Sequence, residues 1–264
     1  MSSYRRGHEP TSGPGRRQRD ASPLDGAPPP ASGPAAIQFS EASLSAAKWL
    51  AMLLMVLDHS NKYLFDGTVS WMYALGRLSM PLFAIVVGLN LARPGMLEHG
   101  GYRRLCIRLA VFGTLASTPF IAINDLPAGW WPLNMMFTLL VATVAAWLFD
   151  RPGTASKIFG WLVFAWGGAL GEFWWPAVCL CLCVWAYQRH PTRSLLAGFF
   201  LCLAALWFIN GNFWAFAVLP VMWALQRCWL WRLPRAKWFF YAFYPAHLAI
   251  FWALTLWHLP MPAG

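Results

Sequence analysis

Charged side chains are scarce in this sequence of 264 residues, because Asp, Glu, Lys and Arg make up only 11% of it. Soluble domains carry about 25% charged residues and are about 45–50% apolar, whereas this chain is 58% hydrophobic and 17% aromatic. The apolar residues lie in long blocks, which excludes a soluble domain, a collagen, a disulfide scaffold and a disordered chain. The composition therefore predicts an all-α, polytopic helical membrane protein.

Several other features are missing. The formal net charge is +10, yet most of the cations lie between apolar blocks, which is typical of membrane topology and excludes a nucleic-acid partner. The chain has no glycine-rich phosphate loop, nucleophile elbow, paired metal motif or internal repeat. We therefore predict no bound metal.

The first 43 residues differ from the rest of the chain. They are rich in Ser, Pro and Gly, with three consecutive prolines at 28–30, and have few apolar side chains. Such a segment buries too little surface to offset the entropy lost on ordering. We predict a disordered cytosolic tail over 1–43 and an integral-membrane domain over 44–264.

From Leu44 onward the apolar blocks are long enough to count as membrane spans. At 1.5 Å per residue, about 20 residues cross a hydrocarbon core of ~30 Å. The fifth and sixth blocks are shorter than this. The sequence predicts about nine spans in a lipid bilayer, at 44–65, 70–92, 104–123, 132–149, 157–170, 173–188, 194–211, 213–231 and 237–258.

The distribution of Lys and Arg predicts the orientation of these spans. Cytoplasmic loops are enriched in basic residues, and here the basic residues gather in the even-numbered connections, whereas the opposite connections hold Lys62. This asymmetry predicts a cytosolic N-terminus and an external C-terminus. The basic residues of the predicted inner face are Arg93, Arg103, Arg104, Arg108, Arg151, Lys157, Arg189, Arg193, Arg227, Arg232, Arg235 and Lys237.

Polar residues inside the predicted spans are the candidate functional residues, because ionisable groups are costly in lipid and usually face an interior cavity. They could instead be hydrogen-bonded groups that hold helices together, and the cations could snorkel to an interface. The candidates are Lys48, Asp58, His59, Arg77, Asn134, Glu172, Tyr244 and His247.

Helix geometry relates the residues of the first span. Lys48 and His59 are eleven residues apart, so they share a face and lie about 16 Å apart along the axis. Asp58 points about 100° away from His59, so a carboxylate partner for His59 has to come from elsewhere. Glu172 is the available carboxylate.

The predicted depths of the candidates suggest one cavity. His59 and Arg77 lie at a similar depth in the outer half, Asn134 begins the fourth span from outside, and His247 lies near the midplane. We therefore predict a His-centred polar cavity open to the outside. These residues alone do not separate an acyltransferase from a proton-coupled transporter.

Three cysteines fall at alternate positions in the sixth predicted span. In a helix Cys179 and Cys183 share a face while Cys181 points away, so these three cannot gather around one metal. We interpret them as small packing residues. No pair of cysteines outside the spans suggests a disulfide.

The candidate residues also lie in four short motifs, and in this order the motifs resemble those of the TraX family, which includes the TrbP-type conjugal transfer proteins. The resemblance covers about residues 44–250, and the family is in turn similar to integral-membrane acyltransferase-3 proteins. The motifs are Asp58-His59, Gly76-Arg77-x3-Pro81-Leu82-Phe83, Asn134-x3-Thr138-Leu139 and Phe243-Tyr244-Pro245-x-His247-Leu248.

The resemblance implies transfer of an acetyl group from acetyl-CoA to the N-terminal amine of a conjugative pilin subunit, in the bacterial inner membrane. His59 would be the general base with Glu172 as its orienter, and Asp58 accompanies it in the motif. Arg77 and Asn134 would stabilise the oxyanion, and Tyr244 and His247 would position the acyl group or relay a proton. The expected contacts of the CoA phosphates are Lys48, Arg103, Arg104 and Arg108.

Three other functions stay open at this point. A membrane O-acetyltransferase acting on a cell-envelope glycan would use the same cavity with an alcohol acceptor. A proton-coupled transporter would use the intramembrane residues without acyl transfer. A structural assembly factor would work alongside the other pilus assembly proteins, and its intramembrane histidines would serve stability alone.

Overall fold

The structure is a computed structural model that describes residues 37–227 and 237–258. All regular structure in this part of the chain is helical, which confirms the predicted all-α class, and pairing between extended segments is limited there to one isolated bridge between Leu133 and Gly171. Most of the predicted tail 1–43, together with Arg232, Arg235 and the side chain of Lys237, lies outside the described residues.

Within the described residues, every predicted span coincides with helical structure, although the helices are not all continuous. The first four spans correspond to α1 (Glu41–Leu64), α2 (Ser70–Gly76) with α3 (Ser79–Leu91), α4 (Gly101–Ile123) and α5 (Met135–Asp150). The next two correspond to α6 (Thr154–Leu170) and α7 (Trp174–Arg189). The last three correspond to α8 (Arg193–Ala205) with α9 (Trp207–Asn210), η1 (Trp214–Ala217) with α10 (Val218–Arg227), and α11 (Lys237–His258).

Four helical stretches in the described residues are long and apolar enough to cross a membrane: Ser70–Leu91, Gly101–Ile123, Arg193–Asn210 and Trp238–Trp257. The apolar helix Met135–Asp150 is shorter. The count of nine spans and the orientation of the chain stay predictions.

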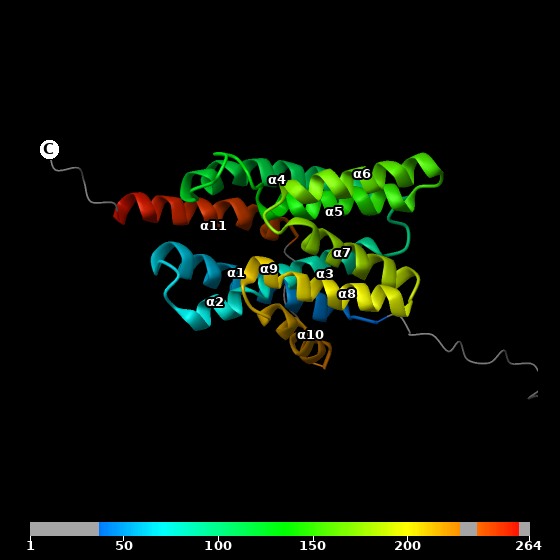
Figure 1. Cartoon of the computed structure of the whole chain (residues 1–264), viewed down its shortest axis with the longest axis horizontal. Helices are drawn as coiled ribbons and strands as arrows, with labels where there is room; N and C mark the ends of the chain where they lie inside the picture. The colour runs from blue at the N-terminus through cyan, green and yellow to red at the C-terminus, as the bar shows by residue number, and fades with distance from the viewer. Residues whose placement is uncertain (1–36, 228–236, 259–264) are drawn as a thin grey trace, which may run out of the picture. The chain divides into compact units, whose positions relative to one another are not determined.

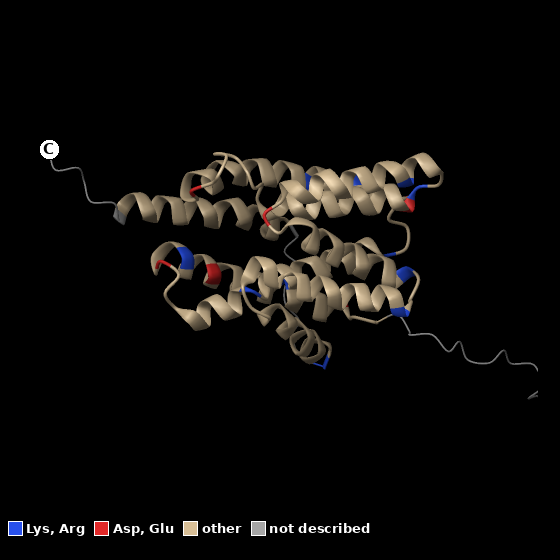
Figure 2. Cartoon of the chain, viewed as in Figure 1, with Lys and Arg blue, Asp and Glu red and all other residues tan. Residues whose placement is uncertain are grey.

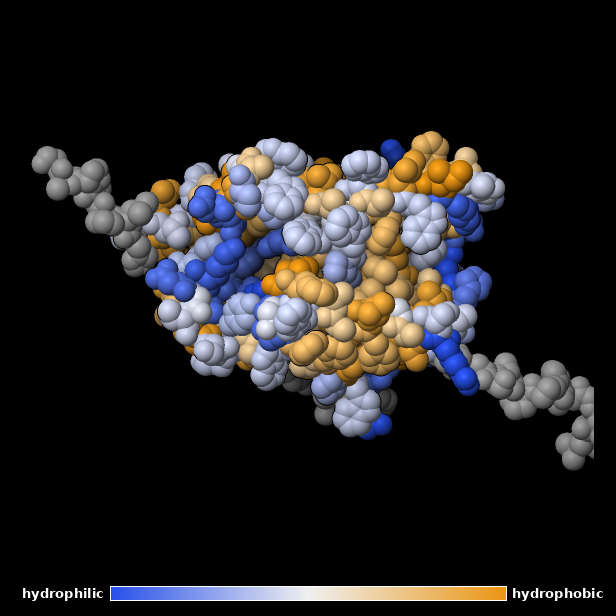
Figure 3. Space-filling model, viewed as in Figure 1, coloured by the Kyte–Doolittle hydropathy of each residue, from blue (hydrophilic) through white to orange (hydrophobic). Residues whose placement is uncertain are grey.

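Large apolar side chains cover the outside of the helices, as expected of a surface that meets lipid. Trp257, Phe208 and Trp166 are 87%, 80% and 75% exposed. Figure 3 shows hydrophobic side chains over the middle of the molecule and hydrophilic ones toward the ends of the helices. In Figure 2, Lys and Arg gather where α5 meets α6 and α7 meets α8, and Asp150 lies there in an ion pair with Arg189.

Local sequence signals explain where the helices begin and break. Ser40 caps α1, because its hydroxyl accepts a hydrogen bond from the Ser43 amide at 3.0 Å. The second predicted span divides after Gly76, and Pro81 lies in the first turn of α3, where a missing N–H costs no helical hydrogen bond. Arg77 is therefore placed at a bend between two helices.

The helices pack in a set of neighbouring pairs around two buried clusters. α3 packs against α1 and α7, α7 against α8, α4 against α5 and α11, and α5 against α6 (Figure 1). The larger cluster fills the space around α3 and α7. The smaller one joins Met52 and Met55 of α1 to Leu109 of α4, Met136 of α5 and Leu248 of α11.

Candidate functional site

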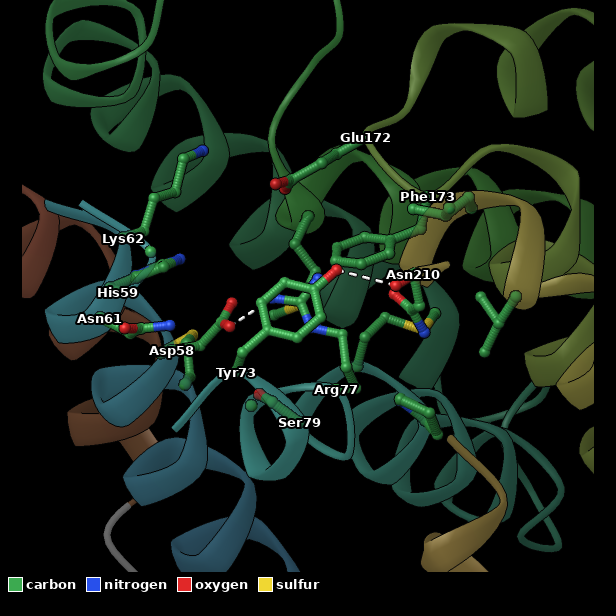
Figure 4. Close-up of a pocket in the computed structure, with 18 of the residues that line it drawn as sticks. Asp58, His59, Asn61, Lys62, Tyr73, Arg77, Ser79, Glu172, Phe173 and Asn210 are labelled. Atoms are coloured by element: carbon green, nitrogen blue, oxygen red, sulfur yellow. Dashed lines mark hydrogen bonds and ion pairs between the residues drawn. The ribbon is translucent and has the colours of Figure 1, made fainter. Parts of the chain in front are cut away.

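A polar cavity of about 330 Å³ lies where α1, the bend between α2 and α3, the α6–α7 connection and α9 meet (Figure 4). The start of α5 and the middle of α11 complete its lining. Five of the predicted site residues line it: Asp58, His59, Arg77, Glu172 and Tyr244. The predicted cavity therefore gathers His59 and Arg77 from separate helices as expected, whereas Asn134 and His247, which were also expected in its wall, do not line it.

Two histidines form a hydrogen-bonded pair at the edge of this cavity. His59 Nδ1 lies 2.8 Å from Nε2 of His247, the two rings are nearly parallel, and His247 Nδ1 lies 3.0 Å from the Phe243 carbonyl oxygen. His247 is buried behind His59 and is 4% exposed. α11 thus supplies the partner of the histidine on α1.

The pair fixes the tautomers of both rings when they are neutral. The Phe243 carbonyl only accepts, so His247 Nδ1 donates to it and His247 Nε2 is left as an acceptor. His59 Nδ1 then donates to His247, which leaves Nε2 of His59 with a free lone pair. The His59 ring points toward the cavity in Figure 4, so the pair presents a basic nitrogen there.

This arrangement differs from the predicted partner of His59. We expected Glu172 to orient the imidazole, but Nδ1 of His59 bonds to His247, and in the described residues no carboxylate hydrogen-bonds the ring. The expectation failed because helix periodicity gives the face of a residue on its own helix and does not say which neighbouring helix packs there.

Asp58 and Arg77 form an ion pair across the cavity, with only 20% and 16% of their side chains exposed. The Arg77 guanidinium also lies over the Tyr73 ring, 4.4 Å from its centroid. Its Nε–H is buried and has no hydrogen-bond partner in the part of the chain that the structure describes. Arg77 is therefore held by Asp58 and Tyr73 while one of its buried donors is left unpaired.

The backbone next to Arg77 approaches Asp58 closely. A Cβ atom at Gly76 would overlap the Asp58 carboxylate, so only glycine leaves room for the ion pair there. Tyr73 is fixed at its far end, since its hydroxyl donates to the Asn210 carbonyl at 2.8 Å. The bend between α2 and α3 is thus tied to α1 and to the end of α9.

Glu172 reaches the cavity from the connection between α6 and α7. Its amide donates to the Leu133 carbonyl at 2.8 Å, and the Leu133 amide donates to the Leu170 carbonyl at 2.8 Å. Burial raises the pKa of the Glu172 carboxyl to about 7, against the opposing effect of the Lys62 ammonium. This carboxyl is poised to exchange a proton near neutral pH.

Asn134 and Tyr244 are placed differently from each other. Tyr244 is buried and lines the cavity. Asn134 does not line the cavity: its amide nitrogen donates to the Gly113 carbonyl at 2.9 Å, and its oxygen accepts from the Met136 amide at 3.1 Å. The oxygen caps α5 and the amide nitrogen is occupied by Gly113 and Ser117 of α4, so nothing in this geometry supports the predicted oxyanion role.

The predicted CoA contacts lie away from this cavity. Lys48 is in the first half of α1, Arg103 and Arg104 are exposed near the start of α4, and the Arg108 guanidinium stacks on Trp238 at 4.9 Å. Between Lys48 and His59, Met55 lines the cavity and belongs, with Met52, to the smaller buried cluster. The Lys48–His59 stripe is therefore filled by side chains in this structure.

The cysteine pattern is only partly as predicted. Cys179 and Cys183 share a face, with their sulfur atoms 3.9 Å apart, and Cys181 is buried elsewhere in the larger cluster. Cys202 of α8 joins the first two, and the three sulfur atoms lie within 4.8 Å of one another. Sequence spacing missed Cys202 because it comes from a different helix.

Sequence reasoning also missed Tyr73, Phe173 and Asn210 in the cavity lining. Tyr73 precedes Arg77 by four residues, which is the spacing of side chains stacked on one helix face, so this contact had a usable signal. Asn210 had no comparable signal, because its position depends on the break between α8 and α9.

Comparison with known proteins identifies the family of this sequence. The model of the family described as "TraX protein" matches residues 43–255. Protein TraX of Escherichia coli is 35% identical over 224 residues, covering 79% of this chain and 86% of that protein. Protein TraX of Escherichia coli strain K12 is 33% identical over 223 residues with the same coverage. No solved structure matches the chain. With the family match spanning all five cavity residues, this chain belongs to the TraX family.

Proposed function

We propose that this protein is an integral-membrane acetyltransferase of the bacterial inner membrane. It transfers the acetyl group of acetyl-CoA to the N-terminal amine of a conjugative pilin subunit. The observation that carries the proposal is the His59–His247 pair, which directs a basic nitrogen into a cavity that also holds Arg77. A general base beside a cationic donor is what acyl transfer to an amine requires.

His59 acts as the general base in this proposal. As the neutral amine nitrogen bonds to the thioester carbonyl carbon, Nε2 of His59 takes the proton that the nitrogen loses. When the tetrahedral intermediate collapses, the C–S bond breaks and His59 returns that proton to the departing thiolate. His247 keeps His59 in the productive tautomer throughout, because its Nε2 accepts from His59 Nδ1.

Arg77 stabilises the oxyanion of the intermediate. Its side chain lines the cavity, and its ion pair with Asp58 holds the guanidinium in place. One preorganised donor of this kind lowers the barrier by about 3–4 kcal/mol. Asp58 is thus a positioning residue.

The nucleotide end of acetyl-CoA is expected at the basic inner face of the protein, where Lys48, Arg103, Arg104 and Arg108 are available for its phosphates. The pantetheine arm would follow the Lys48–His59 stripe, so the Met52 and Met55 side chains have to move to admit it. Unbranched methionine side chains adapt readily to such a change.

The test is the intact mass of the pilin made in cells with the wild-type protein, without it, and with His59→Ala. We expect one acetyl group that requires both the protein and His59, with a rate loss of about 10²–10⁴-fold in the variant. His99→Ala is the matched control, because His99 is exposed and outside the cavity. Full acetylation by a correctly inserted His59→Ala protein would contradict the proposal, and no acetylation by the wild type would favour an alcohol acceptor or transport.

A further inference from the structure

The charged side chains of the cavity differ in whether they have a hydrogen-bonded or ion-paired partner. Asp58 is paired with Arg77, and the Lys62 ammonium donates to the Asn124 amide oxygen at 2.6 Å. The Glu172 carboxylate also lines the cavity, yet within residues 37–227 and 237–258 it has no ion pair and no side-chain hydrogen bond. The Glu172 carboxylate thus faces the cavity, and its oxygens accept no hydrogen bond from the described residues.

Hydrogen bonds hold the backbone on both sides of Glu172. The residues around it are held by the bridge between Leu133 and Gly171, and the Trp131 indole N–H donates to the Ala169 carbonyl at 3.0 Å. Gly171 is pressed against Thr138, where a Cβ would overlap the threonine hydroxyl. Figure 4 shows the carboxylate directed into the cavity, above Tyr73 and Arg77. The backbone that carries Glu172 is therefore fixed by hydrogen bonds and close packing, and the side chain extends from it into the cavity.

A carboxylate removed from water is costly unless a cation or several donors reach it. The neighbouring cations, Lys62 and Arg77, contact Asn124 and Asp58, and in the described residues neither forms an ion pair with Glu172. A primary ammonium supplies both a positive charge and three N–H donors, whereas a hydroxyl supplies one donor and no charge. The cavity therefore favours an amine over an alcohol at this point.

We propose that Glu172 binds the ammonium group of the acceptor and thereby selects a primary amine over a hydroxyl. This inference rests on the proposed function in taking the acceptor site to be this cavity. It assigns to Glu172 a contact with substrate in place of the expected contact with His59.

The same contact prepares the amine for attack. The bound ammonium gives one proton to a Glu172 oxygen, so an N–H bond breaks and an O–H bond forms, leaving a neutral amine and a neutral carboxyl. The amine then attacks the thioester, and His59 takes the second proton. A free α-ammonium has a pKa of about 7.7–8.0, which is close enough to that of the Glu172 carboxyl for rapid exchange.

The experiment measures binding alone, without acetyl-CoA, on the full chain purified in lipid nanodiscs. The probes are a peptide of the first residues of the pilin and the same peptide with its terminal amino group replaced by hydroxyl. We expect wild type to bind the amine about tenfold or more tightly at pH 8. Glu172→Gln should bring the two affinities within about threefold, and Glu172→Asp should keep part of the preference.

Glu98→Gln is the matched control, because Glu98 is an exposed glutamate away from the cavity, and thermal unfolding checks that each variant is folded. An amine preference that survives in folded Glu172→Gln overturns the inference, and so does equal binding of both probes by wild type. If pilin stays unacetylated while the preference depends on Glu172, the acetylation proposal fails and the ammonium site stands.

Discussion

At the scale of single residues, the chemistry of the cavity depends on which atoms are already bonded. The carbonyl of Phe243 determines the tautomer of His247, and His247 determines that of His59. The same accounting shows that Asn134 is occupied, since its amide nitrogen donates to Gly113 and Ser117 of α4 and its oxygen caps α5. Glu172 stands out because its oxygens have no comparable bond among the described residues.

His247 provides a direct test of the tautomer argument. Replacing it with Ala leaves His59 in place but removes the acceptor of its Nδ1–H, so the basic nitrogen is no longer fixed toward the cavity. We expect His247→Ala to lower kcat for acetylation by about 10–100-fold with little change in the KM for the acceptor.

Gln in place of His247 restores an acceptor and should recover part of the rate. Rates are measured with purified protein against wild type and the exposed-histidine variant His99→Ala. Equal kcat for His247→Ala and wild type would refute the tautomer argument.

The raised pKa of the Glu172 carboxyl predicts how the free energy of unfolding depends on pH. Its pKa rises from 4.5 to about 7 on folding, so the folded state holds the proton more tightly. The resulting stabilisation is complete below about pH 4.5 and is lost as the pH rises through 7. Glu172→Gln keeps a neutral side chain, so it should be more stable than wild type at pH 8, by at most about 3 kcal/mol.

The comparison is thermal unfolding in detergent between pH 5 and pH 8. The difference in Tm between Glu172→Gln and wild type should shrink as the pH falls. A difference that does not depend on pH would show that the carboxyl is not destabilised by burial.

At the scale of elements, the break between α2 and α3 positions the site. Because the helix ends at Gly76, Arg77 lies at a bend and faces Asp58 of α1. The break between α8 and α9 similarly brings Asn210 to Tyr73. The isolated bridge at Leu133 and Gly171 sets the place of Glu172. Irregular backbone thus supplies three sides of the cavity, as membrane proteins allow where backbone is enclosed by protein.

The close approach at Gly76 predicts a selective loss of function. In Gly76→Ala the new methyl group would meet the Asp58 carboxylate and push it away from Arg77. We expect unfolding to cost about 1–3 kcal/mol less than in wild type and acetylation to fall at least tenfold.

Gly198→Ala is a suitable control, because its Cβ would meet only the Cys183 sulfur, at 3.3 Å. Both variants are compared by thermal unfolding and by the mass of the pilin product. Wild-type acetylation by Gly76→Ala would mean that the Asp58–Arg77 pair does not position the site.

At the scale of the whole molecule, the surface is covered by apolar side chains, whereas the cavity collects charged and polar ones. Large apolar side chains such as Trp166 and Trp257 cover the outside, whereas charged and polar groups converge inside. The basic loops at Arg151 and Arg189 lie at the helix ends farther along α5 and α7 from Glu172. This separation agrees with a cytosolic basic face and a cavity nearer the opposite side.

Reporter fusions test the predicted orientation of the chain in the membrane. With the N-terminus in the cytosol and nine spans, alkaline phosphatase fused after Gly264 should be active and green fluorescent protein fused there should be dark. Fusions in the loop after Arg189 should give the reverse pattern. A bright C-terminal fluorescent fusion would contradict the predicted topology, because it would place the C-terminus in the cytosol.

The sequence by itself determined the helical membrane class, the helical segments and the residues around which the site forms. Apolar blocks and intramembrane charges are local properties, so His59, Arg77 and Glu172 could be predicted without coordinates. Only the tertiary structure decided their partners. It paired His59 with His247, used Asn134 as a cap and gave Glu172 a place in the cavity lining with no side-chain hydrogen bond among the described residues. Helix periodicity gives each side chain a face, but helix packing decides what that face meets.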